Sequence, residues 1–365
     1  MSLRCGIIGI TNSGKTTLFN CVSSTRAEST RFAFSSSRSN IGMAPVPDPR
    51  LDRLLTLQPT EKVTPVTVEL VDIPGLARGS GAGEGVGSKF LADIRNTDAL
   101  IHVLRCFDDP ALPHVEGTVN PVRDMETVDL ELQAKDMESV VRKLERLEKT
   151  AKAGDKQAKK GVEVLEQLRD HLDALRPARS FEISAEDYRY FADMFLLSAK
   201  PVMYVCNVDE TSLKEPNVHV HRVMDALKGQ ETEILVIGAK LEAEIAELDD
   251  PAERMEYLRD AGLSEPGVNR LIRSAYRLLD LRTFFTVGPQ EIRAWTLKAG
   301  MNAQQAAGVI HSDLERGFIR AEVMKYDDFV TLGSESACRD AGKLHLQGKN
   351  YIVEDGDILH IRFNV

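Results

Sequence analysis

Short apolar runs alternate with longer amphipathic stretches over much of this chain. Five of the runs, at residues 5–8, 66–71, 99–104, 202–206 and 234–237, have the length and composition of buried strands. The stretches between them carry apolar residues at helical spacing. Continuous apolar strands that alternate with helices are typical of a mostly parallel sheet covered by helices. The pattern therefore predicts an α/β domain with helices on both faces of one sheet.

Between the third and fourth of these runs, at residues 128–175, the pattern becomes charged and helical. Apolar residues recur at steps of three and four on both sides of a break near residues 154–161. This spacing predicts an antiparallel, coiled-coil-like helical hairpin with an apolar seam. The tip of the hairpin is basic, with Lys149, Lys152, Lys156, Lys159 and Lys160. Two explanations stay open for this charge: a solvated hairpin end without a partner, and a contact with nucleic acid.

The last part of the chain, from residue 281, has a different pattern. Short alternating stretches at 282–287, 292–296, 318–323, 351–353 and 358–363 predict strands, and residues 304–315 predict a helix. Such a segment favours a small sheet packed on a helix. It contains no evident catalytic cluster, and docking is the simplest role for it.

Composition narrows the class of protein. The length of 365 residues allows two or three domains, and the net charge of −10 argues against a surface given over wholly to nucleic acid. The start has no signal-peptide pattern, and no apolar run approaches the roughly 20 residues that span a bilayer. Five cysteines without C-x-x-C spacing predict buried thiols rather than a zinc site. We expect a cytoplasmic protein with neither membrane nor DNA among its partners.

A phosphate-binding motif follows the first predicted strand. Residues 9–16 match G-x-x-x-x-G-K-[ST] and open onto a helix-like run at 17–22. In such a loop, backbone N–H groups and the helix N-terminus surround phosphate oxygens. Lys15 is expected to reach the β- and γ-phosphates, and the Thr16 hydroxyl to bind Mg²⁺. The predicted nucleotide-binding residues here are Asn12, Ser13, Gly14, Lys15, Thr16 and Thr17.

A second element supports nucleotide hydrolysis. The strand at 66–71 runs into D-x-x-G, in which Asp72 is expected to hold Mg²⁺ and Gly75 to sense the γ-phosphate. The next residue is Leu76 rather than a water-orienting Gln, which predicts slow intrinsic turnover. Five glycines at alternate positions in 79–87 fit either a nucleotide-sensing switch or a purely structural loop.

Residues 207–210, Asn-Val-Asp-Glu, stand where a Ras-type GTPase carries Asn-Lys-x-Asp. Val208 replaces the Lys that lies along the base, and the longer Glu210 replaces the Asp that accepts hydrogen bonds from guanine. A site built for one hydrogen-bonding edge rejects a ligand that lacks it, so these changes point away from GTP. The alternative is that these residues form only a turn after a strand.

Together these motifs resemble the YchF/Obg-like ATPase family of P-loop proteins. The stretches that carry the resemblance are 40–51, 71–76, 83–91, 96–107, 285–295, 306–311 and 315–322. The resemblance implies a discontinuous P-loop domain (1–125 and 200–280), a coiled-coil arm (126–199) and a ubiquitin-like β-grasp TGS domain (281–365). It also implies ATP as the preferred nucleotide over GTP, dependence on Mg²⁺, and association with the ribosome or ribosomal RNA.

The resemblance further assigns residues to roles. His114 matches the proposed water-positioning histidine, which makes His114 and Lys15 the expected catalytic residues. Ser36 matches the Mg²⁺-sensing hydroxyl, although Arg38 stands where relatives have Glu. Asn207, Val208, Glu210, Gly238, Ala239 and Lys240 form the base side, with Gly238 in place of the usual Ser. Asn12 is linked in related proteins to K⁺ near the phosphates, and K⁺ stays an open alternative here.

The resulting hypothesis is an ATPase of slow basal turnover that acts as a nucleotide-dependent switch in translation or stress response. Two alternatives stay open: a GTPase of the same fold, and a nucleotide-gated binding adaptor whose hydrolysis is incidental. Leu76 favours the adaptor somewhat, since an enzyme selected for turnover is expected to keep a good water-orienting residue.

Overall fold

The computed structural model describes residues 3–24, 40–75 and 86–364, and the chain divides into two compact units. The first unit comprises Met1–Gly42 and Glu69–Leu271, and the second comprises Met43–Val68 and Ile272–Val365. The resemblance implied that residues 43–68 belong to the P-loop domain (1–125 and 200–280). These residues join the second unit because β3 (Lys62–Thr64) pairs in parallel with β9 (Glu291–Lys298) of that unit's sheet.

The first unit is built on a six-stranded sheet of order β2-β4-β1-β5-β6-β7. Four adjacent pairings (β4 with β1, β1 with β5, β5 with β6, β6 with β7) are parallel. The carboxyl ends of β1, β4, β5 and β6 therefore lie along one edge, where open α/β sheets bind ligands. The strands are β1 (Arg4–Ile8), β2 (Asn40–Pro45), β4 (Thr67–Asp72), β5 (Ala99–Arg105), β6 (Val202–Asn207) and β7 (Ile234–Ile237).

Helices pack on both faces of this sheet, as expected from its apolar strands. One core cluster joins the sheet to α3, α4 and α7 through Phe90, Val128 and Val220, and α1 packs with α8. This confirms the predicted P-loop fold class. The helices of this unit, apart from the hairpin, are α1 (Lys15–Ser24), α3 (Val86–Arg95), α6 (Thr211–Lys214), α7 (Val218–Ala226), α8 (Ala239–Glu247) and α9 (Pro251–Asp260). Helix α10 (Gly267–Leu278) begins in the first unit and ends in the second.

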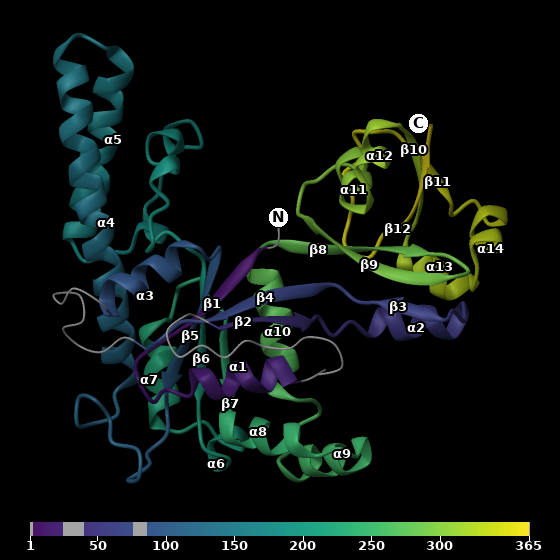
Figure 1. The fold of residues 1–365 in the computed structure, drawn as a ribbon, viewed down its shortest axis with the longest axis horizontal. Coiled ribbons are helices and arrows are strands. Elements are labelled where there is room, and N and C mark those ends of the chain that lie inside the picture. The colour runs from purple at the N-terminus through teal and green to yellow at the C-terminus, as the bar shows by residue number, and fades with distance from the viewer. Residues whose placement is uncertain (1–2, 25–39, 76–85, 365) are drawn as a thin grey trace. The chain divides into compact units, whose positions relative to one another are not determined.

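A long helical hairpin is inserted between β5 and β6 (Figure 1). Helix α4 (Pro121–Lys152) begins with Asn120 as N-cap and Pro121 in its first turn, and α5 (Lys156–Asp173) begins with Asp155 as N-cap. Both starts follow ordinary capping chemistry. Of the predicted seam, Val140, Leu144, Leu165, Leu168 and Leu172 are buried between the helices, and Met137, Leu147 and Val162 are partly buried. Leu175 lies past the end of α5 and is exposed, and Val164, which was not predicted, joins the buried seam.

Gly161 does not break the hairpin but allows close packing inside α5. A Cβ at this position would lie 2.5 Å from Leu147 Cδ2 and 2.9 Å from the Tyr190 ring. The returning chain contains three short 3₁₀ helices, η1 (Ala178–Ser180), η2 (Asp187–Tyr190) and η3 (Ala192–Met194). It is tied to α4 by buried Asp136, whose carboxylate accepts three hydrogen bonds of 2.7 Å, from Leu197 N, Ser198 N and Ser198 Oγ.

The second unit is a six-stranded mixed sheet of order β11-β10-β12-β8-β9-β3 with α11 packed on one face. Its strands beyond β3 and β9 are β8 (Leu281–Val287), β10 (Phe318–Met324), β11 (His345–Gln347) and β12 (Ile358–Phe363). The helices are α2 (Pro49–Leu57), α11 (Ala303–Ile310), α12 (Ser312–Arg316), α13 (Tyr326–Leu332) and α14 (Glu335–Asp340). This agrees with a small sheet on a helix.

Two details of the second unit differ from the pattern. The helix predicted at 304–315 is two helices, because His311 is extended, ends α11 and caps α12 with its side chain. The strand predicted at 351–353 is reduced to a single bridge between Ile352 and Asn302. The apolar residues there pack on the core as Tyr351 and Val353, so burial rather than strand pairing explains their pattern.

All five cysteines are buried. Burial raises the pKa of the thiols of Cys5, Cys21 and Cys338, and the pKa of Cys106 is raised by its contact with Cys206 and by burial. The predicted buried thiols are thus confirmed. None of the helices in the described ranges is long and apolar enough to cross a membrane.

Candidate nucleotide-binding site

The loop between β1 and α1 has the backbone of a phosphate-binding loop. Gly9, Asn12 and Gly14 have positive φ values of 147°, 62° and 96°. A Cβ on Gly14 would lie only 2.1 Å from Asn207 Nδ2, so both the conformation and the space require glycine. Helix α1 begins at Lys15, so the N–H groups of its first turn point toward the loop.

Lys15, Thr16 and Asp72 lie together below this loop. Buried Lys15 donates from Nζ to Ile10 O at 2.7 Å, and Thr16 Oγ1 donates to Asp72 Oδ2 at 2.9 Å. Burial lowers the pKa of Lys15 to about 8, against the opposing effect of Asp72. Burial also raises the pKa of Asp72, against the effects of Thr16 and Lys15. An incoming phosphate would supply Lys15 with a counter-charge in place of a carbonyl.

The donor set at Thr16 and Asp72 fits Mg²⁺. Both groups offer hard oxygen atoms, as this cation prefers. Within the described ranges, buried Asp72 Oδ1 lacks a hydrogen-bond partner, which is the state expected of an oxygen that faces an ion or its water. The third predicted ligand, Ser36, lies outside the described residues, as do Leu76 and the glycines up to position 85.

The end of β6 connects the phosphate loop to the base side. The Asn207 side chain donates from Nδ2 to Ser13 O at 2.9 Å and accepts from Ala239 N at 2.9 Å. It therefore fixes residues 13 and 239 relative to each other. Val208 is buried, whereas Glu210 is exposed at the start of α6. Asp209 Oδ1 accepts from Thr211 Oγ1 and Ser212 N. Burial is the largest single effect and raises the Asp209 pKa, but the hydrogen bonds from residues 211 and 212 together outweigh it, so the pKa is lowered.

These segments enclose a cavity of about 700 Å³, large enough for a nucleotide. Nine predicted residues line it: Asn12, Gly14, Lys15, Thr16, Thr17, Asn207, Val208, Ala239 and Lys240. Ser13, Gly75, Glu210 and Gly238 are not among the described lining residues. Ser13 and Gly238 are buried, and a Cβ on Gly75 would lie 2.9 Å from Lys15 Nζ.

Sequence reasoning missed part of the wall. The segment after β5 contributes Phe107, Asp108, Asp109, Pro110 and Leu112, and Asp209 and Ala243 add to the base side. No motif marks residues 107–112. The available signal was their position directly after the carboxyl end of a strand next to β1, where ligands of open sheets bind.

His114 lies in the same loop but does not line the cavity. Its side chain is 2% exposed, and Nε2 lies 3.0 Å from Asp124 Oδ2. Nδ1 accepts from Glu116 N at 3.0 Å. Because Nδ1 accepts, Nε2 carries the proton and donates to Asp124. The predicted catalytic histidine is therefore placed close to the site, with both ring nitrogens bonded to other groups.

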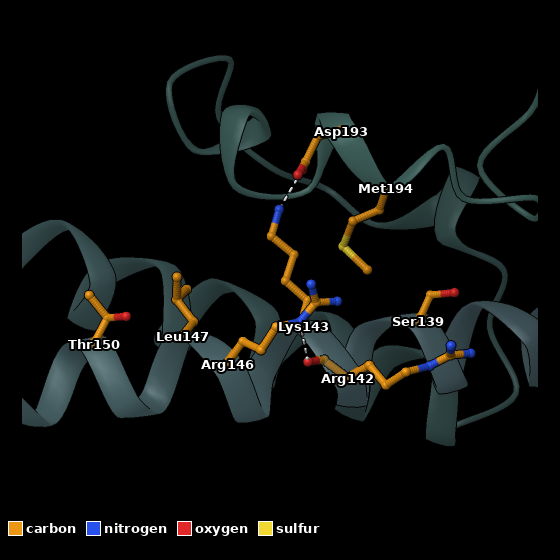
Figure 2. Close-up of a pocket in the computed structure, with 8 residues that line it drawn as sticks. All are labelled: Ser139, Arg142, Lys143, Arg146, Leu147, Thr150, Asp193 and Met194. Carbon is orange, nitrogen blue, oxygen red and sulfur yellow. Dashed lines mark hydrogen bonds and ion pairs between the residues drawn. The ribbon is translucent and has the colours of Figure 1, made fainter.

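A second hollow lies on the hairpin, between α4 and η3 (Figure 2). Its volume is about 400 Å³. Lys143 reaches across it to pair with Asp193, while Arg142 and Arg146 lie along the exposed face of α4. Arg146 Nε donates to Arg142 O at 3.2 Å. Cationic side chains thus outnumber carboxylates in this groove, which is lined by Ser139, Arg142, Lys143, Arg146, Leu147, Thr150, Asp193 and Met194.

The parallel sheet, the glycine-rich loop and the Lys15–Thr16–Asp72 group define a P-loop nucleoside-triphosphatase. Residues 4–146 match a family model described as "50S ribosome-binding GTPase", and residues 281–364 match YchF-GTPase_C, described as "Protein of unknown function (DUF933)". "Ribosome-binding ATPase YchF" of Pasteurella multocida is 44% identical over 365 residues, which cover 100% of both chains. The chain belongs to the YchF/Obg-like ATPase family.

Other relatives agree. "Obg-like ATPase 1" of Rattus norvegicus is 38% identical, over 100% of this chain and 93% of the relative. The solved structure of the YchF GTPase of Schizosaccharomyces pombe has a TM-score of 0.89 at 31% identity, over 99% of this chain and 98% of that one. The resemblance inferred from the motifs is thereby confirmed. The names of these relatives differ between ATPase and GTPase, so the similarity supports a nucleotide hydrolase without identifying the base.

Proposed function

We propose that this protein is a Mg²⁺-dependent ATPase of slow basal turnover that works as a nucleotide-dependent switch on the ribosome. The observation that carries the choice of ATP is the base side of the cavity. Glu210, which stands at the guanine-reading position, is exposed and outside the described lining, and buried Val208 replaces the Lys. Without a carboxylate at that position to accept hydrogen bonds from guanine, the pocket gives GTP no advantage in affinity over ATP.

In this proposal the phosphate site works through charge and position. The N–H groups of residues 13–17 and the Lys15 ammonium bind the β- and γ-phosphates, and Asn207 keeps the loop in place. Thr16 and Asp72, with Ser36, would hold Mg²⁺, which neutralises charge that develops on the phosphate oxygens. Gly75 leaves room for Lys15 and contributes an N–H to the γ-phosphate. Asn12 is the residue through which K⁺ would act.

Slow basal turnover follows from the groups that surround the reaction. Leu76 has no polar atom with which to orient water, and His114, which we propose as its substitute, is bonded to Asp124 and Glu116. A histidine that is fully hydrogen-bonded elsewhere does not position the attacking water. Hydrolysis should therefore be slow until a partner changes the site.

We propose ribosomal RNA as the partner of the hairpin. The relatives' names attach ribosome binding to this family. On this chain the groove with Arg142 and Arg146, together with the basic tip, offers the positive charge that RNA phosphates require. Reversing Lys149 and Lys152 to Glu should weaken binding to ribosomes and flatten its salt dependence, whereas unchanged binding would remove the hairpin from the interface.

A GTPase is the second candidate, because the Asp209 carboxylate lines the cavity and its Oδ2 could accept from guanine. The deciding experiment is a parallel titration of ATP and GTP, with and without K⁺, on one sample, followed by steady-state hydrolysis of both. We expect ATP to bind at least tenfold more tightly. Tenfold tighter binding of GTP would refute the choice of ATP.

A further inference from the structure

The loop of residues 106–120 connects the nucleotide cavity to the base of the hairpin. Its first part, residues 107–110 and Leu112, lines the cavity. Asn12 Nδ2 of the phosphate loop donates to Pro113 O at 3.4 Å. The following residue is His114, whose ring is turned to Asp124 and not to the cavity. Two adjacent residues, Pro113 and His114, therefore carry the contact to the phosphate loop and the contact to the hairpin.

Asp124 belongs to the first turn of α4, the 32-residue helix that forms one side of the hairpin. The Asp124 and His114 side chains are 3% and 2% exposed, so water does not compete for their hydrogen bond. Arg123, the nearest cation, lies 3.5 Å from the other carboxylate oxygen and is partly exposed. The bond between a carboxylate and a ring N–H is charge-assisted and among the stronger hydrogen bonds in proteins. It fixes the ring.

We propose that Asp124 is a positioning residue that holds His114 in a resting position and thereby keeps basal hydrolysis low. The inference rests on the proposed function, in which His114 places the attacking water. When Asp124 moves with the first turn of α4, the ring is released and turns toward the phosphate loop. The hydrogen bond from Glu116 N to His114 Nδ1 joins two residues of the same loop, so it does not tie the ring to α4.

The hairpin offers a way for a bound partner to act on the hydrogen bond between Asp124 and His114. Helix α4 is about 48 Å long at 1.5 Å per residue, and Asp124 lies at its base while Arg142 and Arg146 lie further along it. A partner bound to the groove or the tip acts on the same rigid element that carries Asp124. The first turn of α4 is thus the place where binding on the arm meets the hydrolysis site.

The test compares steady-state ATP hydrolysis by the full-length wild type with that of Asp124→Ala, Asp124→Asn, His114→Ala and the double variant His114→Ala/Asp124→Ala. We expect Asp124→Ala to raise kcat about tenfold at unchanged KM, the factor that one charge-assisted hydrogen bond represents. Asp124→Asn, which keeps a neutral acceptor, should give a smaller rise. The double variant should fall back to the rate of His114→Ala.

Asp129→Asn is the matched control, because Asp129 is also on α4 and pairs with Arg179 at 2.7 Å without touching His114. It should leave kcat unchanged. A lower or unchanged kcat in Asp124→Ala would overturn the inference. If the alanine variant does not fold, Asp124→Asn decides in the same way, since an isosteric amide preserves packing.

NMR of ¹⁵N-labelled histidine rings provides a readout that does not depend on hydrolysis. The wild type should show His114 as the Nε2–H tautomer with a slowly exchanging ring proton, and Asp124→Ala should lose that protection. A wild type without a protected His114 proton overturns the hold itself. A sample that shows the protected proton but hydrolyses no ATP would instead refute the proposed function.

Discussion

The stability of the first unit should depend on pH through His102. This residue lies on β5 with 1% exposure, 5.7 Å from the Tyr204 ring between centroids, and buried Nε2 has no hydrogen-bond partner among the described residues. Burial, with smaller effects of Arg179 and Lys15, lowers its pKa from 6.5 to about 3. The folded state therefore needs the neutral ring, and the unfolded state binds the proton more tightly.

The sign and size of the effect follow from those two values. The stability contribution is fully present above pH 6.5 and is lost as the pH falls from 6.5 toward 3. At pH 5 the unfolded histidine is about 97% protonated and the folded one about 1%. The difference destabilises the folded state by about 2 kcal/mol relative to pH 7.5.

The assay is urea unfolding at pH 7.5 and pH 5 of the wild type and of His102→Gln, which is neutral at both values. Circular dichroism at 222 nm follows the helices, most of which belong to the first unit. The wild type should lose about 2 kcal/mol more than the variant on acidification. Trp295 lies in the second unit, so its fluorescence reports the unfolding of that unit. The loss of unfolding free energy measured by this fluorescence should be the same in the wild type and in His102→Gln. An equal loss in wild type and variant at 222 nm would refute the reasoning.

Three further substitutions test the site and the two units. Gly14→Ala should weaken ATP binding more than tenfold in calorimetry, because its Cβ would displace Asn207; Gly154→Ala, with φ of 99° and open space around it, is the control. Asp136→Ala should destabilise the first unit by about 3–5 kcal/mol, as followed by circular dichroism at 222 nm, since two buried N–H groups lose their acceptor. The control is Glu138→Ala, which should change the free energy of unfolding by less than about 1 kcal/mol because the Glu138 side chain is exposed. Asp357→Ala should destabilise the second unit by about 3–5 kcal/mol, as followed by Trp295 fluorescence, because fully buried Asp357 binds Lys325, Tyr351 and Glu354 N. The control is Glu354→Ala, which should have little effect because the Glu354 side chain is 68% exposed. Equal effects of variant and control in any pair would contradict the assignment.

Local chemistry allowed much of the fold and the phosphate site to be predicted. The strand runs were identifiable because parallel strands buried on both faces are continuously apolar, as at residues 202–206. Lys15, Thr16 and Asp72 were identifiable because phosphate and Mg²⁺ require those groups at fixed places after a strand.

The remainder depends on contacts between residues far apart or without a motif. His114 had no neighbour in sequence to indicate burial, and only the fold brings the first turn of α4 against it. Gly161 suggested a helix break, yet its role is close contact with Leu147 and Tyr190. Residues 43–68 followed the P-loop pattern, and only the pairing of β3 with β9 places them in the second unit. Such pairings carry no local signal.

The burial of all five thiols has a practical consequence for studies of the arm in motion. Buried thiols with raised pKa values react slowly with maleimides, which require the thiolate. A cysteine introduced on the exposed face of α4, for example Glu138→Cys, should therefore be labelled selectively in the otherwise unaltered protein. A fluorophore at that position would report movements of the hairpin during each round of ATP hydrolysis, without a cysteine-free background that would disturb the core.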